Sequence, residues 1–262
     1  MIKALVNEGM ALVKGKNFWM SVLGISILCW TLAGYYVRLF PGEDILFYLQ
    51  MINVDAPMVA SFSICAYAYA RVYCMEYTEG SMPYIASRTG TKTYVAVRTA
   101  VGFLTGLAVL LLGKMLFVAT ASVWYPLIQP NGSGVRQFAA KGWGLRNLIL
   151  EGRGWLYFSW LSFVQGLMAG VLCVISQTVS LYVMHPAVVI GMPMILNYMT
   201  YNYLDGFLKV PGWLSWLRIY DASQPFFSAD GLQLVYSICY SLIIVSMLGV
   251  FTWRKVKGGL FG

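Results

Sequence analysis

The chain has 262 residues, of which 59% are hydrophobic and only 11% are charged, and its formal net charge is +8. Soluble globular domains carry roughly 25% charged residues. This composition excludes an ordinary soluble domain and indicates a chain that is largely surrounded by lipid.

Stretches of about twenty residues with almost no charge recur between short polar or Gly/Pro-containing segments. A helix needs roughly 20 apolar residues to cross a hydrocarbon layer about 30 Å thick, and lipid leaves few other ways to satisfy the backbone. We therefore predict an all-α, polytopic membrane protein with one transmembrane domain over residues 1–262. The six predicted spans are Asn17–Tyr36, Pro57–Met75, Val95–Trp124, Trp155–Val183, Pro186–Tyr203 and Leu232–Trp253.

The distribution of positive charge favours a cytoplasmic N-terminus. With that orientation the cytoplasmic ends hold ten bases and the outer segments seven, in the direction that the positive-inside rule requires. Both termini are then cytoplasmic, and residues 125–154 and 204–231 form outer loops. We expect the apolar side chains of the first loop to rest among outer headgroups. Only Met184-His185-Pro186 separates the fourth and fifth spans, so one kinked helix is an alternative.

The leader, residues 1–16, is predicted to be an amphipathic interfacial helix. Ile2, Leu5, Val6 and Val13 lie on one helical stripe, which suits a helix along the inner membrane surface. A leader that only increases solubility is the alternative.

The inner loop 76–94 is predicted to contain a short helix. It reads EYTEGSMPYIASRTGTKTY. Pro83 suits the first turn of a helix and Gly90 suits its end, which places the helix at roughly Met82–Thr89.

Small residues at four-residue spacing indicate close contacts between helices. Gly102 and Gly106 share one face of the third span with Gly113, and Gly166 and Gly170 have the same spacing in the fourth. Packing within the chain is the expected role, and a dimer interface is the alternative.

Ionisable groups inside a membrane are costly and are therefore functional candidates. Lys114 lies within the third span, and Arg71 lies near the inner end of the second, after Tyr67 and Tyr69. We take these four residues as candidates for a substrate path. The alternatives are lysine and arginine side chains that reach an interface and ordinary interfacial tyrosines.

Several kinds of chemistry are missing from the sequence. No G-x-x-x-x-G-K-[ST] motif occurs, so we expect no ATP site of its own. The single histidine, His185, stands at a predicted turn and leaves no histidine pair for a metal. We expect no catalytic residue, metal site, cofactor or nucleic-acid partner in this chain.

The order of these features resembles the permease subunits of type-2 ATP-binding-cassette (ABC) transporters, an exporter-like class with six spans. At sequence level the resemblance rests on Glu76-x-x-Glu79-Gly80, followed by Ser87-Arg88-Thr89-Gly90-Thr91-Lys92-x-Tyr94. A similar run follows the second span in these permeases. The chain looks most like bacterial permeases for peptide antibiotics and lantibiotics.

This resemblance implies that loop 76–94 carries a coupling helix seated in a separate ATPase subunit, which binds the ATP and Mg²⁺. The contact residues that it implies are Glu76, Glu79, Gly80, Tyr84, Ser87, Arg88 and Lys92. It also implies the bacterial plasma membrane, a second permease subunit (identical or homologous), and an amphiphilic cargo such as a peptide, antibiotic or lipid-like molecule. The alternatives are an integral membrane enzyme acting on lipid or peptide and a non-transporting membrane immunity protein.

Overall fold

The computed structural model describes residues 2–130, 132–136, 145–200, 211, 213–220 and 230–261. Every element in these ranges is a helix, which confirms the predicted all-α class for the described residues. The elements are α1 (Ile2–Lys14), α2 (Lys16–Leu39), α3 (Ile45–Val54), η1 (Ala56–Val59), α4 (Ala60–Tyr69), α5 (Val72–Thr78), α6 (Met82–Thr89), α7 (Thr91–Ala121), α9 (Arg146–Leu150), α10 (Gly154–Val179), α11 (Pro186–Met199), α12 (Trp216–Tyr220) and α13 (Asp230–Phe261).

Four of the described helices are long and apolar enough to cross a membrane: α2, α7, α10 and most of α13. A fifth candidate is the pair formed by α3 and residues Ala56–Tyr69, which is bent by 76°. These helices indicate a multi-pass membrane protein. The predicted count of six is not confirmed, because α11 has 14 residues and extends only about 21 Å. The rest of the predicted fifth span, residues 201–203, lies outside the described residues.

The predicted second span, Pro57–Met75, is not one straight helix. The apolar helical run already begins at Ile45, and it bends between Val54 and Ala56. Asp55 is extended at this break, and Pro57 lies in the first turn of the helix that follows. Pro57 contributes to the break because it has no backbone N–H to donate within a continuous helix. The run is interrupted again after Tyr69, where α4 ends and the short helix α5 follows.

The centre of the bundle is formed by α7 and α10, and glycines allow their backbones to approach closely. A Cβ on Gly106 would lie 2.7 Å from the carbonyl oxygen of Ala169, and one on Gly170 would lie 2.6 Å from that of Phe103. The other glycines of the predicted set also meet neighbouring helices: Gly102 meets Gln177, Gly113 meets Ile25 and Gly166 meets Leu107. All five therefore lie at contacts within this chain.

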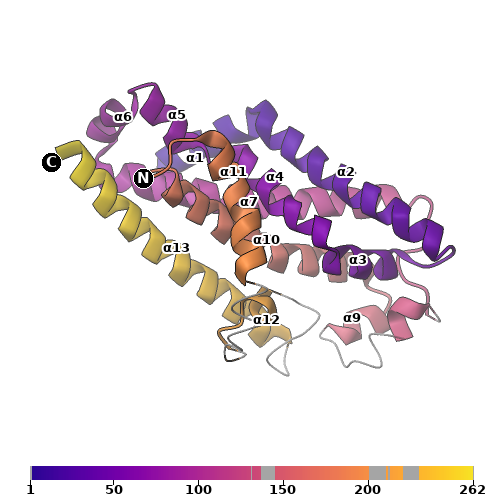
Figure 1. Ribbon diagram of the computed structural model, residues 1–262. Coiled ribbons are helices and arrows are strands. Elements are labelled where there is room, and N and C mark those ends of the chain that lie inside the picture. The colour runs from indigo at the N-terminus through magenta and orange to yellow at the C-terminus, as the bar shows by residue number, and fades with distance from the viewer. Residues whose placement is uncertain are drawn as a thin grey trace.

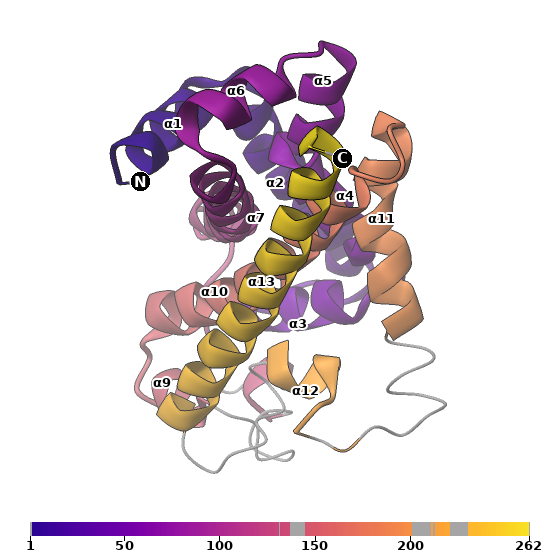
Figure 2. The same cartoon turned by 90° about the vertical axis from the view of Figure 1, so that its left-hand side faces the viewer.

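The molecule has two distinct ends. In both views α1, α5 and α6 gather at one end together with the N- and C-termini, and α9 and α12 lie at the other (Figures 1 and 2). We refer to them as the α6 end and the α9 end. The long helices α7, α10 and α13 run between them.

The loop at the α9 end differs from the expectation that its apolar side chains rest among headgroups. Leu145 and Ile149 are 4% and 3% exposed and belong to the main apolar core. They are buried because α9 packs against α10. Phe138 and Trp143 lie outside the described residues.

Candidate functional site

The exposed side of α6 is the first candidate site. Tyr84, Ser87 and Arg88 are three and four residues apart, so they share one helix face, and all three are exposed. Tyr84 is 75% exposed. Tyrosine and arginine are the residue types that most often dominate protein–protein binding energies. We refer to these three residues as the α6 docking face.

The opposite side of α6 fixes the docking face to the bundle. Met82 is 5% exposed and Ala86 is fully buried. Both belong to an apolar cluster with Tyr94 of α7 and Val256 of α13. A partner that pushes on α6 therefore pushes on two long helices as well.

The two ends of α6 are set by local backbone chemistry. Gly80 and Gly90 have φ angles of +65° and +80°, a region that glycine adopts without the strain that a Cβ would cause. Pro83 lies in the first turn, where its missing N–H costs nothing. The resulting bounds, Met82–Thr89, are those predicted from the sequence.

A cluster of charged and phenolic side chains joins four helices beside α6. Arg98 of α7 forms ion pairs with Glu8 of α1 and with Glu76 of α5. The hydroxyl of Tyr69 accepts a hydrogen bond from Nη1 of Arg98 at 2.9 Å and donates one to Oε1 of Glu8 at 3.0 Å. Tyr94 donates a hydrogen bond to Glu76. We refer to these five residues as the Arg98 cluster.

Glu76 departs from its expected role as the start of a partner contact. Its side chain is only 9% exposed, and its carboxylate already binds Arg98 and Tyr94. Burial raises the pKa of the Glu76 carboxyl, and the hydrogen bond from Tyr94 opposes that rise. A buried carboxylate needs a paired charge to stay ionised at low cost. Glu76 therefore attaches α5 to α7 and is turned away from the surface.

The other predicted contact residues lie at the same end of the molecule. Glu79 and Gly80 are exposed at the turn between α5 and α6. Lys92 is also exposed, and its Nζ lies 5.1 Å from the centroid of the Trp253 ring. This cation–π contact joins the start of α7 to α13.

A second candidate site lies in the middle of the bundle. Lys114 is 1% exposed, and its Nζ donates hydrogen bonds to Oδ1 of Asn53, at 2.6 Å, and to Oε1 of Gln165. Asn53 is the penultimate residue of α3, beside the 76° bend. A lysine at this depth is a functional candidate because its burial is costly. We refer to these three residues as the Lys114 centre.

The four residues predicted to line a substrate path are not brought together. Tyr69 belongs to the Arg98 cluster, which lies about 24 Å along α7 from Lys114. The guanidinium of Arg71 lies 4.8 Å from the ring centroid of Tyr67, and neither residue belongs to the Arg98 cluster or to the Lys114 centre. The four residues therefore divide among three places.

Arg98 and Glu8 do not stand out in the sequence. Each reads as one of several charges near the inner ends of the predicted spans. The available signal is spacing: Tyr69, Tyr73 and Glu76 recur on one helical face, as do Tyr94 and Arg98. Polar residues at such spacing inside apolar helices indicate a shared polar contact.

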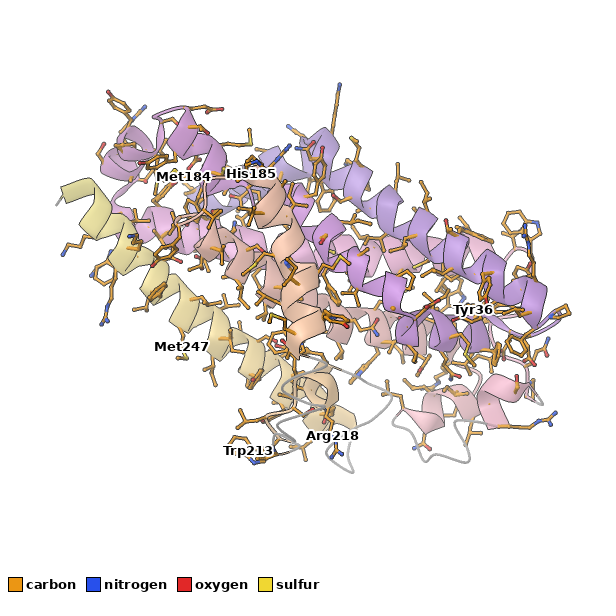
Figure 3. The ribbon with its side chains drawn as sticks, viewed as in Figure 1. Tyr36, Met184, His185, Trp213, Arg218 and Met247 are labelled. Carbon is orange, nitrogen blue, oxygen red and sulfur yellow. The ribbon has the colours of Figure 1, made fainter. Side chains whose placement is uncertain are left out.

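In the part of the chain that the structure describes, no group of three or more His, Cys, Asp or Glu residues is placed to hold a metal ion. His185 precedes α11, and Trp213 and Arg218 lie toward the opposite end of the molecule (Figure 3).

Comparison of the chain with protein-family models, with curated proteins and with solved structures finds no match. The features of this chain that bear on its function are therefore the α6 docking face, the Arg98 cluster and the Lys114 centre.

Proposed function

We propose that the chain is the permease subunit of an ABC transporter, which moves an amphiphilic substrate across a cell membrane with ATP hydrolysed by a separate ATPase subunit. The observation that carries this proposal is the α6 docking face. It presents Tyr84 and Arg88 outward while Met82 and Ala86 fix the helix to the bundle. A permease without a P-loop needs such a surface to receive work from its ATPase.

The path of the chain supports six crossings with both termini in the cytoplasm. Both termini lie at the α6 end (Figure 2), so the number of crossings is even. Counting α11 as a crossing beside the five candidates gives six. Exposed bases also gather at this end, as the positive-inside rule requires of a cytoplasmic side: Lys3, Lys14, Lys16, Arg88, Lys92, Arg254, Lys255 and Lys257.

The Arg98 cluster supports the transmission of force from α6 into the membrane. The segment formed by α5 and α6 connects to α7 through the ion pair between Glu76 and Arg98. Arg98 in turn binds Glu8 and Tyr69, so α1 and α4 are linked to the same point. Movement of the docking face therefore reaches four helices through one guanidinium.

The Lys114 centre is the place that best suits the polar part of an amphiphilic cargo. Transporters often bind substrate where a membrane helix is broken, and Asn53 lies beside the break between α3 and η1. The ammonium of Lys114 and the amide of Gln165 add hydrogen-bonding capacity inside an otherwise apolar bundle. We assign the cargo contact to this centre and the ATPase contact to α6.

The test is to purify the chain together with the products of its neighbouring genes, to ask whether an ATPase is bound, and to measure complex formation and transport. We expect Tyr84→Ala and Arg88→Glu each to weaken the complex by about tenfold or more, the effect of removing an interface hot spot. Arg254→Glu is the matched control, because Arg254 is an exposed base on α13 at the same end. A complex that tolerates Arg88→Glu as well as Arg254→Glu contradicts the proposal, and so does purification without any ATPase.

A further inference from the structure

The inward side of α1 fixes how this helix is rotated. Leu5 and Leu12 pack against a small apolar cluster of α4 and α7, and Glu8 pairs with Arg98. At 100° per residue these three positions share one side of the helix. No residue of α1 is fully buried, so the helix lies on the surface of the bundle, with these three side chains turned toward it.

This rotation exposes an apolar stripe. Ile2 is 75% exposed, Val6 51%, Met10 50% and Val13 47%. The stripe is centred about 120° around the helix from the inward side. It therefore points away from the bundle that α1 leans on.

The charges that remain exposed along this segment are all positive. Lys3 and Lys14 border the apolar stripe and Lys16 follows the helix, and all three are exposed. Glu8, the single acid among residues 1–16, is neutralised by Arg98. An apolar stripe bordered by lysines is the pattern of a helix that lies in an anionic membrane surface.

The apolar stripe continues onto a candidate membrane span. The indole N–H of Trp19 donates a hydrogen bond to the carbonyl oxygen of Val13 at 2.8 Å, and Trp19 is 49% exposed. Met20 and Leu23 extend the exposed apolar surface along α2. Tryptophan favours the boundary between headgroups and acyl chains, which places α1 at that boundary.

We infer that α1 is a docking surface for the anionic phospholipids of the leaflet at the α6 end. Ile2, Val6, Met10 and Val13 enter the acyl region, and the lysines bind headgroup phosphates. The pair between Glu8 and Arg98 sets the rotation of the helix that makes this possible. The inference rests on the membrane location of the chain and not on its coupling to an ATPase.

Spin labels on α1 test the rotation of the helix. Val6→Cys and Asn7→Cys are introduced into a Cys239→Ser background, since Cys239 is the exposed cysteine and Cys29, Cys65, Cys74 and Cys173 are buried. In vesicles, the label at position 6 is expected to be reached by lipid-soluble oxygen, and the label at position 7 by a water-soluble nickel chelate. Equal access of the nickel chelate to both labels overturns the inference, and protection of both from oxygen and nickel indicates a protein partner instead.

Lipid charge is tested with the same label at position 6. Adding phosphatidylglycerol to phosphatidylcholine vesicles is expected to increase the docked population. Lys14→Gln is expected to lower the ratio of docked to undocked helix about fivefold, the effect of one lysine near an anionic surface. Arg153→Gln is the matched control, because it removes one exposed base near the start of α10. The inference is overturned if the docked population does not change with phosphatidylglycerol, or if it falls equally in both variants. Neither result contradicts the binding of an ATPase to α6.

Discussion

The two ends of the molecule are held together by different kinds of interaction. At the α9 end, Asp44 is fully buried, and its carboxylate accepts hydrogen bonds from the backbone N–H of Phe47, at 2.8 Å, and of Gln129, at 2.7 Å. Burial raises the pKa of the Asp44 carboxyl, and these two donors oppose that rise. One side chain therefore joins the start of α3 to the loop that follows α7.

Backbone hydrogen bonds complete the connection at this end. The N–H of Ile45 donates to the carbonyl oxygen of Pro126 at 3.1 Å, and the N–H of Leu46 donates to that of Leu127 at 3.3 Å. Backbone groups cannot change rotamer, so these contacts separate only if the local fold opens. At the α9 end, α3 and the loop that follows α7 are thus joined as one unit.

At the α6 end, separate helices meet through side chains. Arg98 lies 90 residues from Glu8 and 22 from Glu76 in the sequence, and each pair joins two helices. Long charged side chains can exchange partners while their helices stay intact. The contacts at the α9 end therefore hold unless the backbone opens locally, whereas the helices at the α6 end can move as units. The α6 docking face lies at this second end.

The largest effect is expected from Arg98→Ala. The substitution leaves the carboxylates of Glu8 and Glu76 without their shared partner, and breaking a buried ion pair in this way costs about 3 kcal/mol or more. The free energy of unfolding in detergent micelles is the measurement. Arg71→Ala is the matched control, because Arg71 stacks on Tyr67 and such a contact contributes only about 1 kcal/mol. Equal losses in the two variants would show that the Arg98 cluster does not hold the α6 end together.

Asp44→Ala tests the α9 end and is expected to cost about 2–3 kcal/mol. It removes a helix cap and a second charge-assisted hydrogen bond. Glu43→Ala is the control, since Glu43 accepts a longer hydrogen bond, of 3.3 Å, from the backbone N–H of Ser133. Its cost is expected to be about 0.5 kcal/mol. Equilibrium unfolding measures both, and a larger loss for Glu43→Ala would show that Asp44 does not hold the α9 end together.

Gly106→Ala tests the helix contact that connects the two ends. Its Cβ would lie 2.7 Å from the backbone oxygen of Ala169, so α7 and α10 must move apart at a cost of about 1–3 kcal/mol. Gly191→Ala is the matched control on α11, where nothing lies within 4 Å of the new atom. There the change is expected to stabilise the helix by up to about 1 kcal/mol. Thermal unfolding that ranks the variants the other way contradicts the close contact.

The sequence predicts the elements whose limits depend on local chemistry. The bounds of α6 follow from Pro83 and Gly90, and the bounds of α1 match its amphipathic stretch. The facing glycines of α7 and α10 also recur at a four-residue spacing that can be recognised in the sequence. In each case the signal lies within a few residues of the feature that it predicts.

Features that depend on tertiary packing could not be predicted in the same way. The bend after Val54 has a local signal in Pro57, but its angle does not follow from that signal, and hydropathy does not reveal it because the run is nearly uncharged. The pairing of Arg98 with Glu8 depends on which sides of α1 and α7 face each other. The separate pair between Arg98 and Glu76 turns Glu76 inward. The other residues of the predicted partner contact stay exposed: Glu79, Gly80, Tyr84, Ser87, Arg88 and Lys92.

Glu8→Gln is expected to have the smallest effect, and it separates α1 from the rest of the α6 end. The side chain of Glu8 is 30% exposed in its ion pair, so solvent weakens the pair to about 1 kcal/mol. We expect amide hydrogen exchange in α1 to become about fivefold faster, because local opening exposes these amides without global unfolding. Asn7→Gln is the control on the exposed side of the same helix. If Glu8→Gln instead lowers global stability as much as Arg98→Ala does, α1 belongs to one cooperative unit with α7, and the α6 end does not consist of separately movable helices.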